Sequence, residues 1–396
     1  MDVTPLIAQR SRAVDASGIR RVFELGAKLK DPINLSIGQP DFPVPMAVKQ
    51  AAIDAINDDQ NGYTLTQGVA PLRARIARHL IHDLGWPDDT GEPGSGIGMM
   101  VTVGTSGALF LLMMALLDQD SEIIIPDPFF VAYPHMARLM GARAVRCDTY
   151  PDFRMTAERL EPLITPRTRA VLLNSPGNPT GVVMSGRECA QVLELCRSRK
   201  VLLISDEIYD EFCFPDAREV TPGIAGGEAR CPSPARAKGA HEDVVVVRGF
   251  GKTYACTGWR LGYMAGPEAL IRETIKLQQY SYVCAPAPLQ HACAKTFDVD
   301  MMPHILAYQK RRDRVVERLG EVTEVFRPGG AFYCFVKVPD WLGITAQQFC
   351  EQAIERNLLV IPGNVFSSRD THFRISYATK EDNLERGLDV LVSLMQ

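Results

Sequence analysis

The chain has 396 residues, of which 46% are hydrophobic and 23% are charged, and its formal net charge is −4. This length allows two domains, and the near-neutral charge offers no basic surface for nucleic acid or an anionic membrane. The ten cysteines form no CxxC pair, which is typical of reduced thiols in a cytosol-like compartment. Residues 1–21 lack a signal-peptide core, and the longest apolar stretch, 108–117, is about half a membrane span. We therefore expect a cytoplasmic protein.

Short apolar runs alternate with segments of helical length through the first three quarters of the chain. In chain order the runs are 100–103, 123–125, 144–145, 170–173, 201–204, 244–247 and 262–265. This alternation predicts an α/β fold with a large, mainly parallel seven-stranded sheet covered by helices. Polar stretches at 88–98 and 226–243 are expected to be surface loops, the second of them mobile.

After about Pro288 the pattern changes to long charged helices around apolar strands. The expected helices are 308–319 and 346–356, and the expected strands are 331–338, 358–361 and 373–377. This pattern predicts a second, smaller α+β domain.

Polar or glycine-containing loops follow five of the apolar runs: GTSGA, PDPFF, NSPGNPTG, DEIYDEF and GFGK. In open α/β sheets, ligands bind beyond the carboxyl ends of the strands. The five loops are therefore expected to meet at one edge of the sheet and to form a binding site.

The first of these loops is a candidate anion site. Thr105, Ser106 and Gly107 open an apolar helix, where free backbone amides and the helix dipole favour negative charge. Small polar residues also occur at such turns simply as helix caps. Arg260, in a Gly-Trp-Arg-Leu-Gly context, could add a bidentate, charge-assisted phosphate ligand.

Asp206 and Tyr209 end the strand that begins at Val201. A carboxylate at the mouth of a buried strand needs a partner to stay ionised, and a protonated pyridine nitrogen would be one. Tyr209 could reach a hydroxyl on the same ring. The alternative is that Asp206 caps the next helix and Tyr209 packs in the core.

The NSPGNPTG segment is a rigid turn that could present the Asn178 amide to a ligand, or be no more than a turn. Phe129 and Phe130 could stack on a flat heteroaromatic ring, although core packing also explains them.

Lys252 follows the strand Val244–Val247, which is apolar throughout and so fits a strand buried on both faces. An ammonium group in such dry surroundings loses its proton readily and becomes an amine nucleophile that can form an imine with an aldehyde. Together with the phosphate ligand Arg260, this amine suggests pyridoxal 5′-phosphate (PLP). The alternative is an ordinary loop lysine.

Arg374 is a charge inside an apolar strand. Its planar guanidinium group can bind a substrate carboxylate through two hydrogen bonds. The alternative is a structural ion pair with a protein carboxylate.

These motifs, in this order, resemble the PLP-dependent aminotransferases of class I/II, of fold type I, over nearly the full chain. The segments that carry the resemblance are SIGQPDF (36–42), Gly62–Gly68, GTSGA, NSPGNPTG, SDEIYDEF, GFGKTYACTGWRLGY and FRISYA. The resemblance implies a large PLP-binding domain at 46–286 and a small domain formed by 1–45 and 287–396.

The resemblance also implies a role for each motif residue. Lys252 would hold the cofactor covalently, Asp206 would bind its pyridine nitrogen, and Tyr209 and Asn178 its ring oxygen. Arg260 and the Thr105–Gly107 turn, with Ser106, would bind the phosphate, and Phe130 would stack on the ring. Arg374, with Asn178 and the Gly38 backbone, would bind the substrate α-carboxylate. Tyr63 would reach the phosphate of a neighbouring subunit, which implies a homodimer with shared active sites. No metal site is implied.

Two positions depart from the family pattern. Gly249 stands where many relatives have a serine that binds the phosphate, so we expect water or backbone to take over that hydrogen bond. Ser106 stands where some aspartate-specific relatives have a lysine for the distal carboxylate, which puts specificity for an acidic donor in doubt. Ile37, Tyr63, Gln279, Tyr280 and Tyr282 are expected to line the side-chain pocket.

The predicted activity is transfer of the amino group of aspartate, or of a neutral or aromatic L-amino acid, to a 2-oxo acid such as 2-oxoglutarate. A PLP-dependent carbon–sulfur β-lyase of the same fold is the alternative enzyme. A non-catalytic PLP-binding regulator is a third possibility, which the absence of an added basic DNA-binding domain disfavours.

Overall fold

The computed structural model describes residues 1–15, 18, 26, 29–222 and 227–396. Its centre is a seven-stranded sheet with the strand order β2-β10-β9-β6-β5-β3-β4. The strands are β2 (Ile97–Thr102), β3 (Glu122–Asp127), β4 (Arg143–Asp148), β5 (Thr168–Asn174), β6 (Leu202–Asp206), β9 (Val244–Gly249) and β10 (Gly262–Pro267). The predicted α/β class and the large sheet are confirmed.

One strand of this sheet runs against the others. Strands β3, β4, β5, β6 and β9 pair in parallel, whereas β10 is antiparallel to both β2 and β9. The start of β10 therefore lies at the edge where its parallel neighbours end. This reversal brings Arg260, two residues before β10, to the same edge as the loops that follow β6 and β9.

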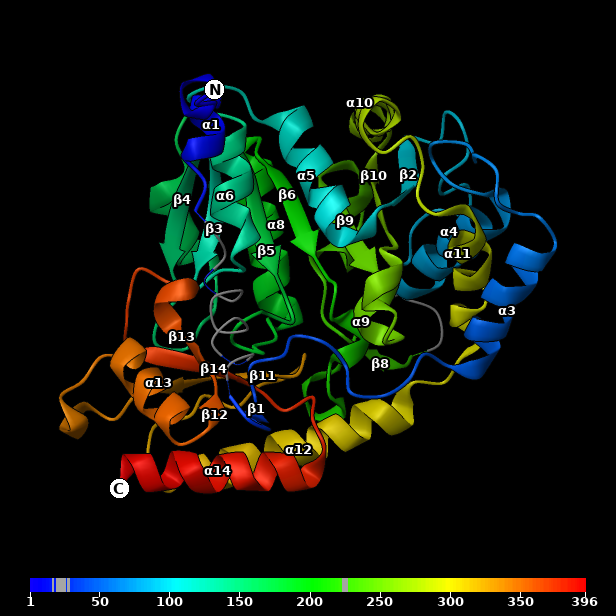
Figure 1. Cartoon of the computed structure of the whole chain (residues 1–396). Coiled ribbons are helices and arrows are strands. Elements are labelled where there is room, and N and C mark those ends of the chain that lie inside the picture. The colour runs from blue at the N-terminus through cyan, green and yellow to red at the C-terminus, as the bar shows by residue number, and fades with distance from the viewer. Residues whose placement is uncertain (16–17, 19–25, 27–28, 223–226) are drawn as a thin grey trace.

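Helices cover both faces of the sheet, as Figure 1 shows. Val244 and Val246 pack into one core and Val245 and Val247 into the other, which explains why this strand is apolar throughout. The first core includes α4 (Ala70–Leu84) and α8 (Gly186–Arg199); the second includes α5 (Gly104–Leu116), α6 (Ala132–Leu139) and α10 (Glu268–Ser281).

The predicted smaller α+β part contains an antiparallel sheet, β11-β14-β13, and a short parallel pair, β1-β12. These strands are β1 (Ile33–Asn34), β11 (Tyr333–Lys337), β12 (Leu358–Leu359), β13 (Ile361–Pro362) and β14 (His372–Ser376). Helices α12 (Met302–Gly320) and α14 (Glu381–Met395) lie side by side along the outside of this part, and α13 (Ala346–Glu355) packs against α14. The pair β1-β12 joins residues near the two ends of the chain.

The junction between the two parts is less sharp than the predicted boundary at residue 286. Helix α11 (Ala287–Cys293) packs on α3 (Met46–Asn57), with Ala292 against Val48 and Ala52. The two-domain division itself stays a proposal.

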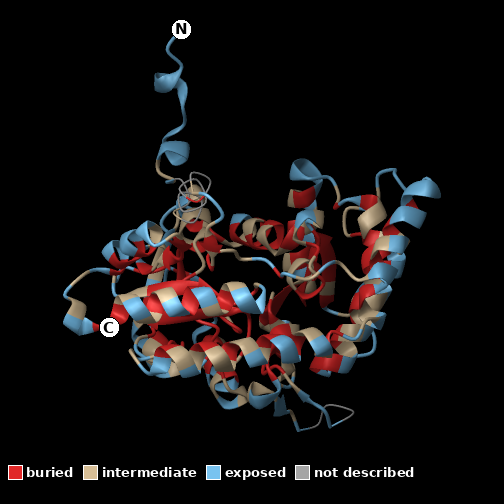
Figure 2. Cartoon of the chain, turned by 60° about the horizontal axis from the view of Figure 1, so that its bottom comes forward, coloured by how far each residue is buried: buried red, intermediate tan, exposed pale blue. Residues whose placement is uncertain are grey.

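The remaining helices and strands are short. They are α1 (Gln9–Arg12), α7 (Ala157–Leu160), the pair β7 (Glu219–Val220) and β8 (Ala229–Arg230), and α9 (Phe250–Thr253), which directly follows β9. Residues 1–12 are exposed and extend away from the body of the molecule (Figure 2). In the described part of the chain, no helix is long and apolar enough to cross a membrane. All ten cysteines are free thiols.

The two expected surface loops differ from the prediction. In the first, Ile97 and Gly98 already belong to β2. In the second, residue 226 lies outside the described residues, and the remainder contains β8 and two short 3₁₀ turns. The mobility of this segment stays a prediction.

Candidate active site

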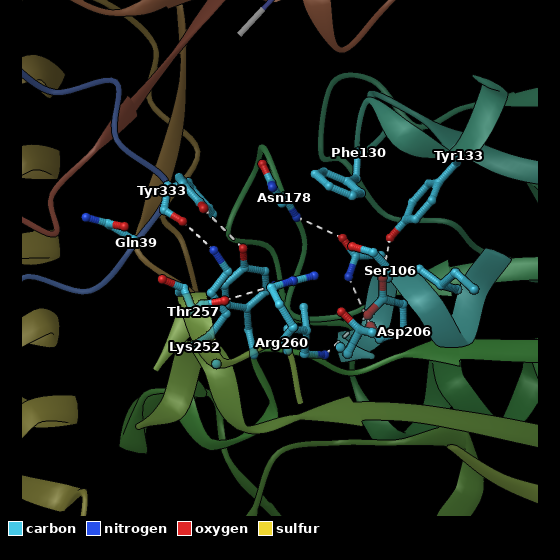
Figure 3. A pocket seen from close by; sticks show the side chains of 18 of the residues that line it. Gln39, Ser106, Phe130, Tyr133, Asn178, Asp206, Lys252, Thr257, Arg260 and Tyr333 are labelled. Carbon is cyan, nitrogen blue, oxygen red and sulfur yellow. Dashed lines mark hydrogen bonds between the residues drawn. The ribbon is translucent and has the colours of Figure 1, made fainter. Parts of the chain in front are cut away.

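A cavity of about 350 Å³ lies at the predicted edge of the sheet, between the ends of its strands and the β11-β14 sheet. Most of the predicted site residues line it: Gly38, Thr105, Ser106, Phe130, Asn178, Asp206, Tyr209, Lys252, Arg260 and Arg374. Figure 3 shows side chains from both parts of the molecule converging on this space. Gly107 is buried in the first turn of α5, and Tyr63 lies outside the cavity with 89% of its surface exposed.

Lys252 lies in the short helix α9, directly after β9. Its Nζ donates a hydrogen bond to the Gly38 carbonyl oxygen. Burial, together with the positive charges of Arg374 and Arg260, lowers the pKa of Lys252 to about 8. Near pH 8, Lys252 is therefore a neutral amine in a substantial fraction of the molecules, and the neutral amine is the form that acts as a nucleophile.

Asp206 is the last residue of β6 and is 3% exposed. The Tyr133 hydroxyl donates to its Oδ2 at 2.6 Å, and the Ile208 amide donates to its Oδ1 at 3.3 Å. Burial raises the pKa of Asp206 to about 6, although both hydrogen bonds oppose the rise. Asp206 does not cap the next 3₁₀ helix, because Tyr209 is its N-cap, but Tyr209 does pack in the core, as the alternative expected.

Arg374 is 1% exposed in the central strand of the small sheet. It donates to Asn178 Oδ1 at 2.9 Å and to the Ser36 carbonyl oxygen at 3.0 Å. Its Nε has no hydrogen-bond partner. Among the described residues no carboxylate lies within 4 Å of its guanidinium, so the structural ion-pair alternative is wrong. A buried guanidinium without a counter-charge is a site for an anionic ligand.

Arg260 lies against the first turn of α5. A Cβ on Gly104, whose φ is +68°, would be 2.8 Å from Arg260 Nη2, so this glycine allows the close approach. Arg260 also donates to the Thr257 carbonyl oxygen at 3.0 Å. The guanidinium and the amides of the helix start thus lie together, an arrangement that suits an anion; the phosphate site itself stays a prediction.

Gly249 has a steric explanation. A Cβ at this position would lie 2.7 Å from Ile208 Cδ1 and 2.9 Å from Thr105 Cγ2. The Thr105 side chain and Ile208 therefore occupy the space that a serine side chain would need.

The sequence matches the family described as aminotransferase class I and II over residues 30–391. The chain is 35% identical to a putative aminotransferase of Bacillus subtilis, with 98% of this chain and 97% of that protein covered. It is 31% identical to aromatic-amino-acid aminotransferase 2 of Thermococcus litoralis, with 98% of each covered. The solved structure of Thermus thermophilus aspartate aminotransferase with maleate superimposes with a TM-score of 0.88 at 31% identity, covering 98% of this chain and 99% of that one.

The chain belongs to the class I and II aminotransferases. It is therefore a transaminase of PLP fold type I, and this family depends on PLP in general. The resemblance stated from the motifs is confirmed.

The expected side-chain pocket of this aminotransferase is only partly formed by the predicted residues. Ile37 lines the cavity. Tyr63 and Tyr280 are each 89% exposed, Tyr282 is 41% exposed, and neither these residues nor Gln279 lines the cavity of their own chain.

Two tyrosines of the aminotransferase site were missed by sequence reasoning. Tyr133 donates to Asp206, and Tyr333 Oη lies 3.1 Å from Tyr209 Oη. Tyr133 follows Phe130 by three residues, almost one helical turn, which is a weak signal that it faces the same ligand. Tyr333 sits in an apolar strand and carries no such signal.

Proposed function

We propose that this aminotransferase moves the amino group of an L-amino acid, either aspartate or a neutral or aromatic one, to a 2-oxo acid such as 2-oxoglutarate, with PLP bound at Lys252. The observation that carries the proposal is the pair formed by a lysine of lowered pKa and a buried arginine without a counter-charge, both facing one cavity. Relatives named for aspartate and for aromatic amino acids support the range of donors.

The residues present fit the cofactor. Lys252 offers an amine for its aldehyde, Asp206 a carboxylate for its pyridine nitrogen, and Tyr209 and Asn178 polar groups for its ring oxygen. Arg260 and the Thr105, Ser106 and Gly107 amides offer an anion site for its phosphate, and Phe130 a ring for stacking. When bound, PLP supplies an electron sink for the charge that develops at the substrate Cα.

Lys252 acts first as the covalent anchor and then as the base. When it is not bonded to PLP, its Nζ would remove the substrate Cα proton as a base and would return a proton as a general acid. Its pKa of about 8 suits both directions near neutral pH.

Asp206 and Arg374 hold the reacting groups in place. The Asp206 carboxylate would keep the pyridine nitrogen of PLP protonated, and the Tyr133 hydrogen bond orients that carboxylate. Arg374, which lines the cavity, would bind the substrate α-carboxylate through its guanidinium. Holding the carboxylate fixes the direction of the Cα–H bond, a positioning effect that lowers the barrier.

The first test replaces Lys252. The variant Lys252→Ala should lose turnover by at least about 10²–10⁴-fold because it removes the base and the covalent anchor. Borohydride reduction of the wild-type enzyme with PLP should leave an adduct on the Lys252 peptide, measured by mass spectrometry. Near-normal transamination by the variant, or no adduct in the wild type, would contradict the proposal. A panel of L-amino acids with 2-oxoglutarate, ranked by kcat/KM, then identifies the donor.

The exposed position of Tyr63 supports a homodimer in which each subunit completes the other's phosphate site. We further propose that the chain is divided into a PLP-binding domain (46–286) and a terminal domain (1–45 and 287–396). Lys252, which would hold PLP, then belongs to the first domain, and Arg374, which would bind the substrate carboxylate, belongs to the second.

A further inference from the structure

Tyr333, the first residue of β11, connects groups that the proposed mechanism treats separately. Its side chain is 1% exposed and borders the cavity (Figure 3). In the β11-β14 pair, Tyr333 is opposite Ser376 and Phe335 is opposite Arg374. Because alternate residues of a strand share a face, Tyr333 and Arg374 project from the same face of the sheet. The guanidinium carbon of Arg374 lies 4.4 Å from the Tyr333 ring centroid.

The Tyr333 hydroxyl faces a second site residue. Its Oη lies 3.1 Å from Tyr209 Oη, with the two rings edge to face at 89°. Each hydroxyl has one hydrogen to donate. If Tyr333 donates to Tyr209, the Tyr209 hydrogen is left for a ligand, and hydrogen bonds in such a chain strengthen each other.

The same hydroxyl lies against the segment that contacts Lys252. A Cβ at Gly38 would be 2.9 Å from Tyr333 Oη, and the Gly38 carbonyl oxygen accepts the hydrogen bond from Lys252. Tyr333 therefore lies next to three parts of the cavity wall: the Arg374 guanidinium, the Tyr209 hydroxyl and the backbone at Gly38.

We propose that Tyr333 is a positioning residue for transamination. Its hydroxyl donates to Tyr209 and directs the Tyr209 proton toward the cofactor ring oxygen, while its ring supports the Arg374 guanidinium that binds the substrate carboxylate. The inference rests on the proposed function, because it needs PLP at Lys252 and a carboxylate at Arg374.

The hydroxyl is tested with the holoenzyme variant Tyr333→Phe. A hydrogen bond to the cofactor ring oxygen stabilises negative charge on that oxygen. It therefore lowers the pKa of the Lys252 nitrogen when that nitrogen is bonded to the cofactor. Weakening that bond should raise the pKa read from the absorbance of the bound cofactor by about 0.3–0.5. In a Tyr209→Phe background the same substitution should have no further effect, because the group it acts through is gone.

The ring is tested by comparing Tyr333→Phe with Tyr333→Leu. The phenylalanine keeps an aromatic face under Arg374, so KM for donor and acceptor should stay within about twofold. The leucine removes that face, and KM should rise about tenfold for both substrates.

Tyr377→Phe is the matched control, because Tyr377 is also fully buried and loses a hydroxyl contact, to the Ala331 carbonyl oxygen, outside the cavity. A cofactor titration of Tyr333→Phe equal to the wild type and to Tyr377→Phe would overturn the role of the hydroxyl. This comparison decides the matter even if Tyr333→Leu does not fold. A wild-type enzyme without the bound-cofactor absorbance would instead contradict the proposed function.

Discussion

Single side chains set the proton chemistry of this site through burial. Asp206 has a raised pKa of about 6 and Lys252 a lowered pKa of about 8, and burial is the main cause of both shifts. The hydrogen bond from Tyr133 acts against the shift at Asp206, because it stabilises the carboxylate.

The variant Tyr133→Phe should therefore raise the pKa of Asp206 above about 6. At pH 6–7 more of the variant carboxyl would be neutral and unable to pair with a protonated pyridine nitrogen, whereas at pH 8 both proteins would be ionised. We expect PLP affinity to fall about tenfold at pH 6.5 and clearly less at pH 8, measured by equilibrium titration of the apoenzyme.

Tyr308→Phe is the matched control for this experiment, since it removes a 2.8 Å tyrosine–aspartate hydrogen bond, to Asp41, outside the cavity. An affinity loss that is equal at both pH values would show that Tyr133 does not act through the ionisation of Asp206.

The sequence could predict residues whose chemistry is unusual where they stand, and it could not predict their partners. Lys252 and Arg374 are charges next to or inside apolar strands, so a ligand could be inferred for each. Tyr133 and Tyr333 look like ordinary core aromatics, because their partners lie 73 and 124 residues away in the chain. Their roles depend on strand order and register, which no local pattern specifies.

At the scale of elements, a buried ionic network holds the loop that follows Asp206, at the end of β6, and contains Tyr209. Arg248 of β9 contacts Glu207 at 2.8 Å and Asp210 at 3.2 Å in that loop, and Asp83 of α4 at 2.8 Å. The Arg248 and Glu207 side chains are 3% and 2% exposed. This arginine therefore joins β6, β9 and α4 beneath the cavity.

Replacing Arg248 should make the protein easier to unfold, because Glu207 would be left as a buried charge without its ion-pair partner, whereas Asp83 keeps Arg230 and Arg236. We expect Arg248→Met to lower the free energy of unfolding by about 3–5 kcal/mol, measured by urea denaturation. Arg327→Met, which breaks an ion pair with Asp216 at an arginine 55% exposed, should cost less than about 1 kcal/mol. Equal losses in the two variants would contradict a stabilising role for the network.

At the scale of the whole molecule, the position of Tyr63 bears on how many chains make a site. It is exposed in its own chain, yet the family resemblance assigns it to a phosphate. If it serves a neighbouring subunit, two different inactive chains can build one intact site between them.

Mixed dimers test this arrangement. In a dimer of Lys252→Ala with Tyr63→Leu, the second chain keeps its own lysine and receives the tyrosine of the first. Random exchange of equal amounts should restore about a quarter of wild-type activity, since about half of the dimers are mixed and each has one complete site. Activity no higher than the sum of the two separate variants would argue that Tyr63 serves its own chain or none.

The pairing of Ile33–Asn34 with Leu358–Leu359 has a consequence for biosynthesis. During translation, the first strand leaves the ribosome more than three hundred residues before the segment it must join. The strands of the seven-stranded sheet leave the ribosome in that interval, whereas Arg374 lies in β14 and emerges after all of them. The part of the cavity that contains Lys252 can thus form before Arg374 is available to complete its lining.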